Sequence, residues 1–135
     1  MLLLVLCSAL SVQSQRLVGG RQEVPVSDPG AQEATTFAMD AYNRGSNSLY
    51  YYKLLRVLKV ETQVVAGLKY FLTVELVKTQ CEKRGNSGLK HVDLQHCAVP
   101  PEAEQEKLLC ELQVWSRPWL HKTELVQVKC QPSSS

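Results

Sequence analysis

The residues of this chain whose side chains are able to do chemistry are five cysteines and three histidines. No two cysteines stand in the CxxC spacing of a zinc site, and His91, His96 and His121 form no ligand pattern. We therefore predict no metal site and no cofactor. A Ser-His-Asp or Cys-His catalytic arrangement has no support either, because each cysteine of the predicted mature chain is needed for a disulfide bond. The sequence favours a protein that is not an enzyme.

Four cysteines in the second half of the chain form an even set: Cys81, Cys97, Cys110 and Cys130. A fifth, Cys7, lies in an N-terminal segment that we expect to be removed. Three pairings of four cysteines are formally possible. Their order along the chain favours two local loops, Cys81 with Cys97 and Cys110 with Cys130. Each bridge contributes about 3 kcal/mol in the chain-entropy model. Such bridges indicate an oxidising, extracellular environment.

Two apolar turns, each between two strand-like runs, give the strongest indication of function. They consist of Gln63, Val64, Val65, Ala66 and Gly67 in the first turn and of Pro118 and Trp119 in the second. Apolar residues at an exposed turn lower solubility and add nothing to a core, which indicates a surface that enters the groove of another molecule. Each turn alone is equally well explained as an ordinary hairpin loop, with Gly67 supplying a positive φ. Their joint occurrence favours binding over catalysis.

Residues 1–14 carry no charge and are mainly aliphatic. This pattern predicts a secretory signal peptide over residues 1–14, a mature domain over residues 15–135, and secretion to the extracellular space. The segment is too short to span a bilayer, and no later segment is long and apolar enough to do so. We therefore expect no association with a membrane.

Length, composition and charge bound the remaining classes of protein. The 135 residues, with 44% hydrophobic content, suit a single domain with one core. The formal net charge is +2, and lysines and arginines are scattered among acidic residues instead of being gathered in a stripe. This distribution predicts no nucleic-acid partner.

One helix must pack against the strands that carry the two turns. Residues 15–27 are polar and lack periodicity, which indicates a mobile N-terminal arm, with a short strand near residues 24–26 as a candidate fifth strand. Asp28 and Pro29 predict the start of the helix, as an N-cap acceptor followed by proline at the first helical position. We expect the helix to end near residues 43–45, with Gly45 in the left-handed C-terminal position. Its apolar stripe consists of Ala34, Phe37, Ala38, Ala41 and Tyr42.

Alternating apolar residues predict four strands. We expect these buried faces: Tyr50, Tyr52, Leu54, Leu58 and Val60; Leu68, Tyr70, Leu72, Val74 and Leu76; Leu108, Cys110, Leu112 and Val114; and Val126, Val128 and Cys130. Arg56 interrupts the first face and predicts a bulge. Residues 82–104 indicate an irregular excursion tied at both ends by disulfide bonds. The sequence predicts an α+β fold, an antiparallel sheet of four to five strands on one helix.

Together these motifs resemble the type 2 cystatins, secreted inhibitors of papain-like cysteine proteases. The resemblance covers residues 17–130 and rests on the Gln-x-Val-x-Gly pattern of residues 63–67, on Pro118 and Trp119, on a glycine after the apolar pair Leu17 and Val18, and on the four late cysteines. It implies the cystatin fold and a three-part wedge that fills the protease cleft without covalent chemistry. Leu17 and Val18 would occupy substrate-like pockets, and Gly19 would bend the backbone away from the nucleophile.

Within this family, residues 45–48, 69–73, 91–94 and 105–108 are most similar to cystatin M (E/M), whereas residues 17–20 and 115–117 depart from it. Cystatin M and some relatives inhibit legumain through an asparagine in the loop after the helix. The resemblance implies the same role here for Asn47, flanked by the small residues Ser46 and Ser48. From composition alone, the segment is an ordinary helix-to-strand turn.

The partners implied by the resemblance are papain-like cysteine proteases of the cathepsin L, V and B class and, at a separate edge, legumain. We expect a monomer, with a domain-swapped dimer hinged at residues 64–67 as the alternative. The competing interpretation is a cystatin-fold interaction or host-defence protein without protease inhibition. The family's binding residues are retained, which argues against a loss of protease inhibition: Gly19, Gln63, Gly67 and Trp119.

Overall fold

The computed structural model describes residues 19–84 and 91–133, so the predicted signal peptide, Leu17 and Val18 lie outside the described residues. In chain order the elements are β1 (Gln22–Val24), α2 (Pro29–Gly45), β2 (Tyr50–Val65), β3 (Gly67–Glu82), α3 (His91–Leu94), η3 (Glu102–Glu104), β4 (Lys107–Arg117), η4 (Pro118–Leu120) and β5 (Lys122–Pro132). Among these residues, no helix has both the length and the apolar character needed to cross a membrane.

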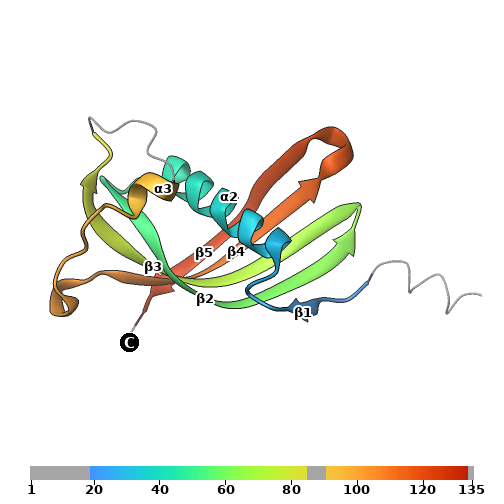
Figure 1. The fold of residues 1–135 in the computed structure, drawn as a ribbon, viewed down its shortest axis with the longest axis horizontal. Coiled ribbons are helices and arrows are strands. Elements are labelled where there is room, and N and C mark those ends of the chain that lie inside the picture. The colour runs from blue at the N-terminus through green and yellow to red at the C-terminus, as the bar shows by residue number, and fades with distance from the viewer. Residues whose placement is uncertain (1–18, 85–90, 134–135) are drawn as a thin grey trace, which may run out of the picture.

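The five strands form one antiparallel sheet in the order in which they occur along the chain. Figure 1 shows α2 crossing one face of this sheet, with the two long strands β2 and β3 passing beneath it. Tight turns join β2 to β3 and β4 to β5, whereas the longer excursion lies between β3 and β4. The α+β fold predicted from the sequence is confirmed.

Both ends of α2 lie where the sequence predicts them, but the conformation at the C-terminal end differs from the prediction. The Asp28 carboxylate accepts a hydrogen bond from the Ala31 backbone N–H at 3.0 Å, and Pro29 occupies the first turn. At the other end, Gly45 does not take the left-handed conformation that we expected. Ser46 caps the helix instead, in an extended conformation with φ of −75°, and its N–H donates to the Tyr42 carbonyl at 2.9 Å.

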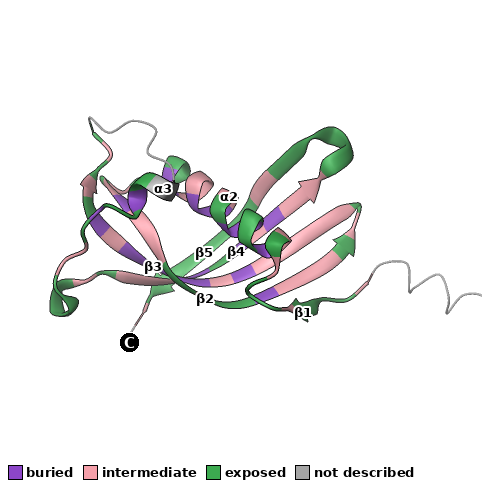
Figure 2. Cartoon of the chain, viewed as in Figure 1, coloured by how far each residue is buried: buried purple, intermediate pink, exposed green. Residues whose placement is uncertain are grey.

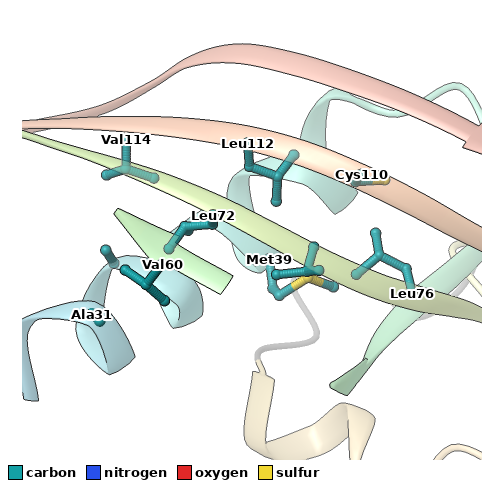
Figure 3. Packing of buried hydrophobic residues seen from close by; sticks show 11 residues of the cluster. Ala31, Met39, Val60, Leu72, Leu76, Cys110, Leu112 and Val114 are labelled. Atoms are coloured by element: carbon teal, nitrogen blue, oxygen red, sulfur yellow. The ribbon is translucent and has the colours of Figure 1, made fainter. Parts of the chain in front are cut away.

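The core lies between α2 and the middle of the sheet. In Figure 3 the Met39 side chain lies among residues of the sheet, and it belongs to one buried cluster with Leu72, Leu76 and Leu112. Most of the remaining helix contribution is alanine, whose small side chain lets the helix approach the sheet closely. Figure 2 shows that burial is concentrated here, whereas the ends of the two hairpins are exposed.

Two irregularities move residues off the faces on which alternation placed them. The register of β2 against β3 shifts between Leu54 and Arg56, which confirms the bulge, and again after Val57. As a result Val57 packs against the core and Leu58 is 47% exposed, so the prediction for Leu58 was wrong.

A further shift, in the pairing of β4 with β5, corrects the last predicted face. The shift lies between Gln113 and Val114 and leaves Val126 opposite no residue of β4. Leu125 therefore packs against the core, whereas Val126 is 40% exposed. Val128 is 46% exposed as well, because β5 is an edge strand, so the prediction that it is buried was wrong. The bulge inserts one extra residue, Val126, into β5, and a prediction from strict alternation of faces does not include such an insertion.

The short strand β1 lies slightly earlier than we expected. Gln22, Glu23 and Val24 pair with Thr62, Glu61 and Val60 of β2. Part of the segment predicted to be a mobile arm is thus hydrogen-bonded to the sheet. The chain then turns before the helix, where the Asp28 N–H donates to the Pro25 carbonyl at 3.0 Å.

Both predicted disulfide bonds are present, Cys81 with Cys97 and Cys110 with Cys130. Cys110 lies in the main core and pairs directly across the sheet with Cys130. The other bridge ties the excursion to β3, and Cys97 forms a second buried cluster with Tyr51 and Leu94. This second cluster lies at the end of the sheet that carries α3 (Figure 1).

Candidate functional site

Three segments far apart in the sequence meet at one end of the sheet, which we call the tip edge: Gly19, residues 63–67 and residues 118–120. Figure 1 shows the β2–β3 and β4–β5 hairpins ending on the same side of the molecule, where β1 also lies. The Gln63 side chain donates a hydrogen bond to the Gly19 carbonyl at 3.0 Å. This bond attaches the N-terminal segment to the first hairpin, a contact that the sequence did not predict.

The first tip is a tight turn with a single residue, Ala66, between the paired Val65 and Gly67. Gly67 has a φ of +96°, which confirms the positive φ expected from the sequence. A Cβ atom on Gly67 would overlap the Ser116 carbonyl oxygen of β4. Only glycine fits this close approach of two backbones. The turn presents Val64, 61% exposed, to solvent.

The second tip is the short 3-10 turn η4, which starts at Pro118. His121 closes it in the left-handed conformation, with φ of 50°, and its N–H donates to the Pro118 carbonyl at 2.9 Å. Trp119 is 59% exposed and Leu120 is 53% exposed. Trp119 is therefore not folded back on the sheet. Leu120 was missed by the sequence reasoning, although its place beside Trp119 in the bend was a signal.

A set of contacts that the sequence reasoning also missed links the first tip to the end of β4, which leads into the second tip. The Trp115 indole N–H donates to the Ala66 carbonyl at 2.8 Å. The Arg117 guanidinium lies over the Trp115 ring, 3.8 Å from its centroid, and pairs with the Glu124 carboxylate of β5. In the sequence, only the departure of residues 115–117 from the cystatin M pattern drew attention to Trp115 and Arg117.

The tip edge is built for contact rather than for proton transfer. Its most exposed side chains are the neutral Val64, Ala66, Trp119 and Leu120. Such side chains displace water from an apolar groove and carry no titratable group. The arrangement therefore suits a non-covalent ligand of another protein's cleft.

The predicted legumain segment lies at the opposite end of the molecule, between α2 and β2 (Figure 1). Asn47 is exposed, and its neighbours form local hydrogen bonds. The Ser46 hydroxyl accepts from the Ser48 N–H, and the Ser48 hydroxyl accepts from the Tyr50 N–H, both at 3.1 Å. The structure thus separates the two sets of predicted site residues.

A lysine at the end of β3 braces the Asn47 segment. Lys83 Nζ donates to the Asn43 carbonyl at 2.6 Å and to the Ser46 carbonyl at 2.9 Å. Burial lowers the pKa of the Lys83 ammonium from its usual value. The Asn43 side chain exchanges two hydrogen bonds of 2.9 Å with the backbone of Tyr52. Sequence reasoning missed Lys83, because its partners are backbone carbonyls about 40 residues away.

Comparisons with known proteins agree with this fold. A sequence model of the Cystatin domain matches residues 19–119. A cystatin of Notechis scutatus scutatus is 48% identical over 130 residues, which cover 96% of this chain and 92% of the relative. A cystatin of Naja kaouthia is 48% identical over 129 residues, covering 95% and 92%.

Solved structures show the same architecture. The crystal structure of dimeric human cystatin F superposes with a TM-score of 0.71 at 29% identity and covers 86% of this chain and 89% of that chain. The crystal structure of Al-CPI gives a TM-score of 0.71 at 28% identity and covers 85% and 100%. The chain belongs to the cystatin family. Membership assigns it a general role as a cysteine protease inhibitor and not as an enzyme.

Proposed function

We propose that this protein is a secreted, reversible, competitive inhibitor of papain-like cysteine proteases of the cathepsin L, V and B class, and that the tip edge is the surface that enters their active-site cleft. The observation that carries the proposal is the exposure of apolar side chains at two neighbouring tips whose backbones the sheet holds in place. Secretion would follow from the predicted signal peptide over residues 1–14.

The mechanism needs no covalent step. Val64, Val65 and Trp119 would displace water from the cleft, and fully burying one such side chain contributes roughly 1.5–3 kcal/mol. A few of these contacts supply much of a nanomolar affinity before ordering costs are subtracted. Gln63 would act mainly by holding Gly19, so that the preceding Leu17 and Val18 reach the substrate-like pockets.

Titration of cathepsin L with the mature chain tests this proposal. Trp119→Ala should weaken inhibition by about tenfold or more, because it removes one apolar contact of the size given above. A form lacking residues 17–19 should also lose affinity. Leu58→Ala is the matched control, since Leu58 is an exposed apolar residue away from the tips.

Leu58→Ala should leave the inhibition constant unchanged. Full cathepsin L activity at micromolar concentrations of the intact protein would instead favour the competing interpretation, a cystatin-fold interaction or host-defence protein that does not inhibit proteases.

A second candidate function, inhibition of legumain, is supported by the exposure of Asn47 between two hydrogen-bonded serines. An asparagine presented on a braced turn suits the pocket of a protease that cleaves after asparagine. Asn47→Lys should abolish legumain inhibition and leave cathepsin L inhibition intact, because the two segments lie at opposite ends of the molecule (Figure 1). Loss of both activities would indicate misfolding and would count against separate sites.

A further inference from the structure

We propose that Trp115 and Arg117 form a clamp that sets the spacing of the two tips before a protease is bound. The proposal rests on the function proposed for the tip edge and adds two positioning residues to it. Neither residue belongs to the apolar turns themselves. Both lie on β4, the strand that adjoins the first hairpin on one side and leads into the second tip on the other.

Trp115 reaches the first tip through its indole nitrogen. Its N–H donates to the carbonyl of Ala66, the single residue of the turn between β2 and β3, at 2.8 Å. The ring itself is held on a paired strand, opposite Lys69 of β3 and Glu124 of β5. Ala66 would otherwise be restrained only through its neighbours in the chain. The bond from Trp115 attaches it to β4, which is paired with a strand on each side.

Arg117 extends the same set of contacts to β5 and to the residue that precedes the second tip. Its guanidinium stacks on the Trp115 ring at 3.8 Å from the centroid and pairs with Glu124 of β5. Its Cγ lies so close to Gly67 that an added Cβ there would be 3.1 Å away. Because Arg117 directly precedes Pro118, the side chain that contacts the first tip also sets the start of the second.

Arginine suits this place better than lysine. A planar guanidinium stacks on an aromatic face while it pairs with a carboxylate, whereas an ammonium does not offer a flat face. Contacts of Trp115 and Arg117 run from Ala66 of the first tip to Glu124 of β5. The clamp therefore links the first tip through side chains to the ends of β4 and β5 that flank the second tip, in addition to the backbone pairing beneath them.

The consequence for binding is pre-organisation. A wedge whose parts already stand at the correct spacing loses less conformational freedom when it enters a cleft, and its affinity is correspondingly higher. Without the clamp the strands remain paired, but the two tips vary more in their separation. Trp115 and Arg117 thus act through Ala66 and Trp119.

A double-mutant cycle with cathepsin L separates positioning from direct contact. Trp115→Phe keeps an aromatic ring for Arg117 and removes the N–H donor, so the inhibition constant should rise about fivefold, in line with the loss of one hydrogen bond. In a Trp119→Ala background the same change should cost less than about twofold, because the second tip no longer contributes its anchor. Equal losses in both backgrounds would overturn the positioning role.

The matched control removes a similar bond from the same strand away from the tips. Gln113 donates to Gln127 at 3.0 Å across β4 and β5. Gln113→Met should leave the inhibition constant unchanged, and Arg117→Lys should weaken inhibition because the stacking is lost. An unchanged constant for both Trp115→Phe and Arg117→Lys would show that the clamp has no role in binding.

A spectroscopic measurement tests the clamp without a protease. The protein has two tryptophans, so its NMR spectrum should contain two indole N–H signals. The Trp115 signal should exchange with solvent more slowly than that of the exposed Trp119, and Trp115→Phe should shift the Ala66 and Trp119 backbone signals. Equal exchange of the two indoles would overturn the clamp, even if the protein proved not to inhibit cathepsin L.

Discussion

The two ends of the molecule hold their exposed segments by different means. At the tip edge, backbone pairing continues to the last residues of the strands, since Val65 pairs with Gly67 and Arg117 pairs with Lys122. At the opposite end, Asn47 lies outside the strands. Its segment depends on side-chain bonds from Lys83 and on local serine hydroxyls, next to the Cys81–Cys97 bridge.

This difference indicates which substitutions should affect binding and which should affect the stability of the fold. A sheet register distributes the positioning of a hairpin over many backbone bonds, so most single side chains at the tips serve contact and not folding. A segment held by few side-chain bonds loses its conformation when one of them is removed. The exceptions at the tip edge are Gln63, whose side chain holds Gly19, and Gly67, because there the backbone path itself requires the residue.

The largest effect is therefore expected at Gly67. Gly67→Ala places a Cβ against the Ser116 carbonyl at a φ of +96°. The strain and the overlap together should lower the free energy of unfolding by about 3 kcal/mol or more. Cathepsin L inhibition should weaken as well, because the first tip is displaced. Urea denaturation and enzyme titration measure the two effects.

Gly45→Ala is the matched control for that variant. The space around Gly45 is open and its φ is not positive. Alanine at the last helical residue should change the free energy of unfolding by no more than about 0.5–1 kcal/mol, in the stabilising direction. Equal losses of unfolding free energy in Gly67→Ala and Gly45→Ala would contradict our conclusion that the backbone at the tip edge requires glycine at position 67.

The next largest effect concerns the bridge near the Asn47 segment. Replacing both Cys81 and Cys97 by serine opens a loop of 16 residues in sequence separation, which should cost about 3 kcal/mol of unfolding free energy. Amide hydrogen exchange should quicken around Tyr51 and Leu94, which share the buried cluster with the bridge. Exchange at the tips and inhibition of cathepsin L should stay unchanged.

Removal of the Cys110–Cys130 bridge gives the contrast. Its sequence separation is 20, so a similar loss of stability is expected, but Cys110 lies in the main core that both ends share. Faster exchange confined to one end in this variant would contradict the distinction between the two ends.

A smaller effect is expected at Lys83. Lys83→Met keeps the stem and removes the donor to the Asn43 and Ser46 carbonyls. The free energy of unfolding should fall by about 1 kcal/mol, and amide exchange should quicken at residues 46–48. Lys129→Met, an exposed lysine on β5, is the control and should change neither quantity. Slow exchange retained at residues 46–48 would show that the serine bonds alone suffice.

The smallest effect is a loss of stability at alkaline pH. Burial raises the pKa of Tyr42, Tyr52 and Tyr70 above the ordinary tyrosine value of 10.0 in the folded protein. The unfolded chain therefore loses these protons first, so stability present below pH 10.0 is lost as the pH rises through the folded values. The lowered pKa of Lys83 acts in the opposite direction, with stability rising as the pH rises toward its unfolded value of 10.5.

Urea denaturation at several alkaline pH values measures this dependence. Two of the three tyrosines, Tyr42 and Tyr52, pack edge to face at 5.9 Å near the Asn47 segment. Tyr42→Phe and Tyr52→Phe should each flatten the pH dependence. A stability that increased above pH 10.0 in the native protein would mean that Lys83 outweighs the tyrosines.

Local pattern predicted much of the fold and the members of the candidate site. Alternation located the strands, Asp28 and Pro29 located the start of the helix, and Arg56 marked the first bulge. Alternation misplaced Leu58 and Val126, because a bulge changes the face of every later residue and its position depends on the partner strand.

The sequence by itself determined the family, both disulfide pairs, the positive φ of Gly67 and the two apolar turns, because each depends on residue type and on near neighbours in the chain. Only the tertiary structure showed that Gly19 is bonded to Gln63, that Lys83 braces the Asn47 segment and that Trp115 and Arg117 join the tips. The three hydrogen bonds among these contacts link residues 37 to 49 positions apart, and their existence depends on how the sheet brings distant strands together.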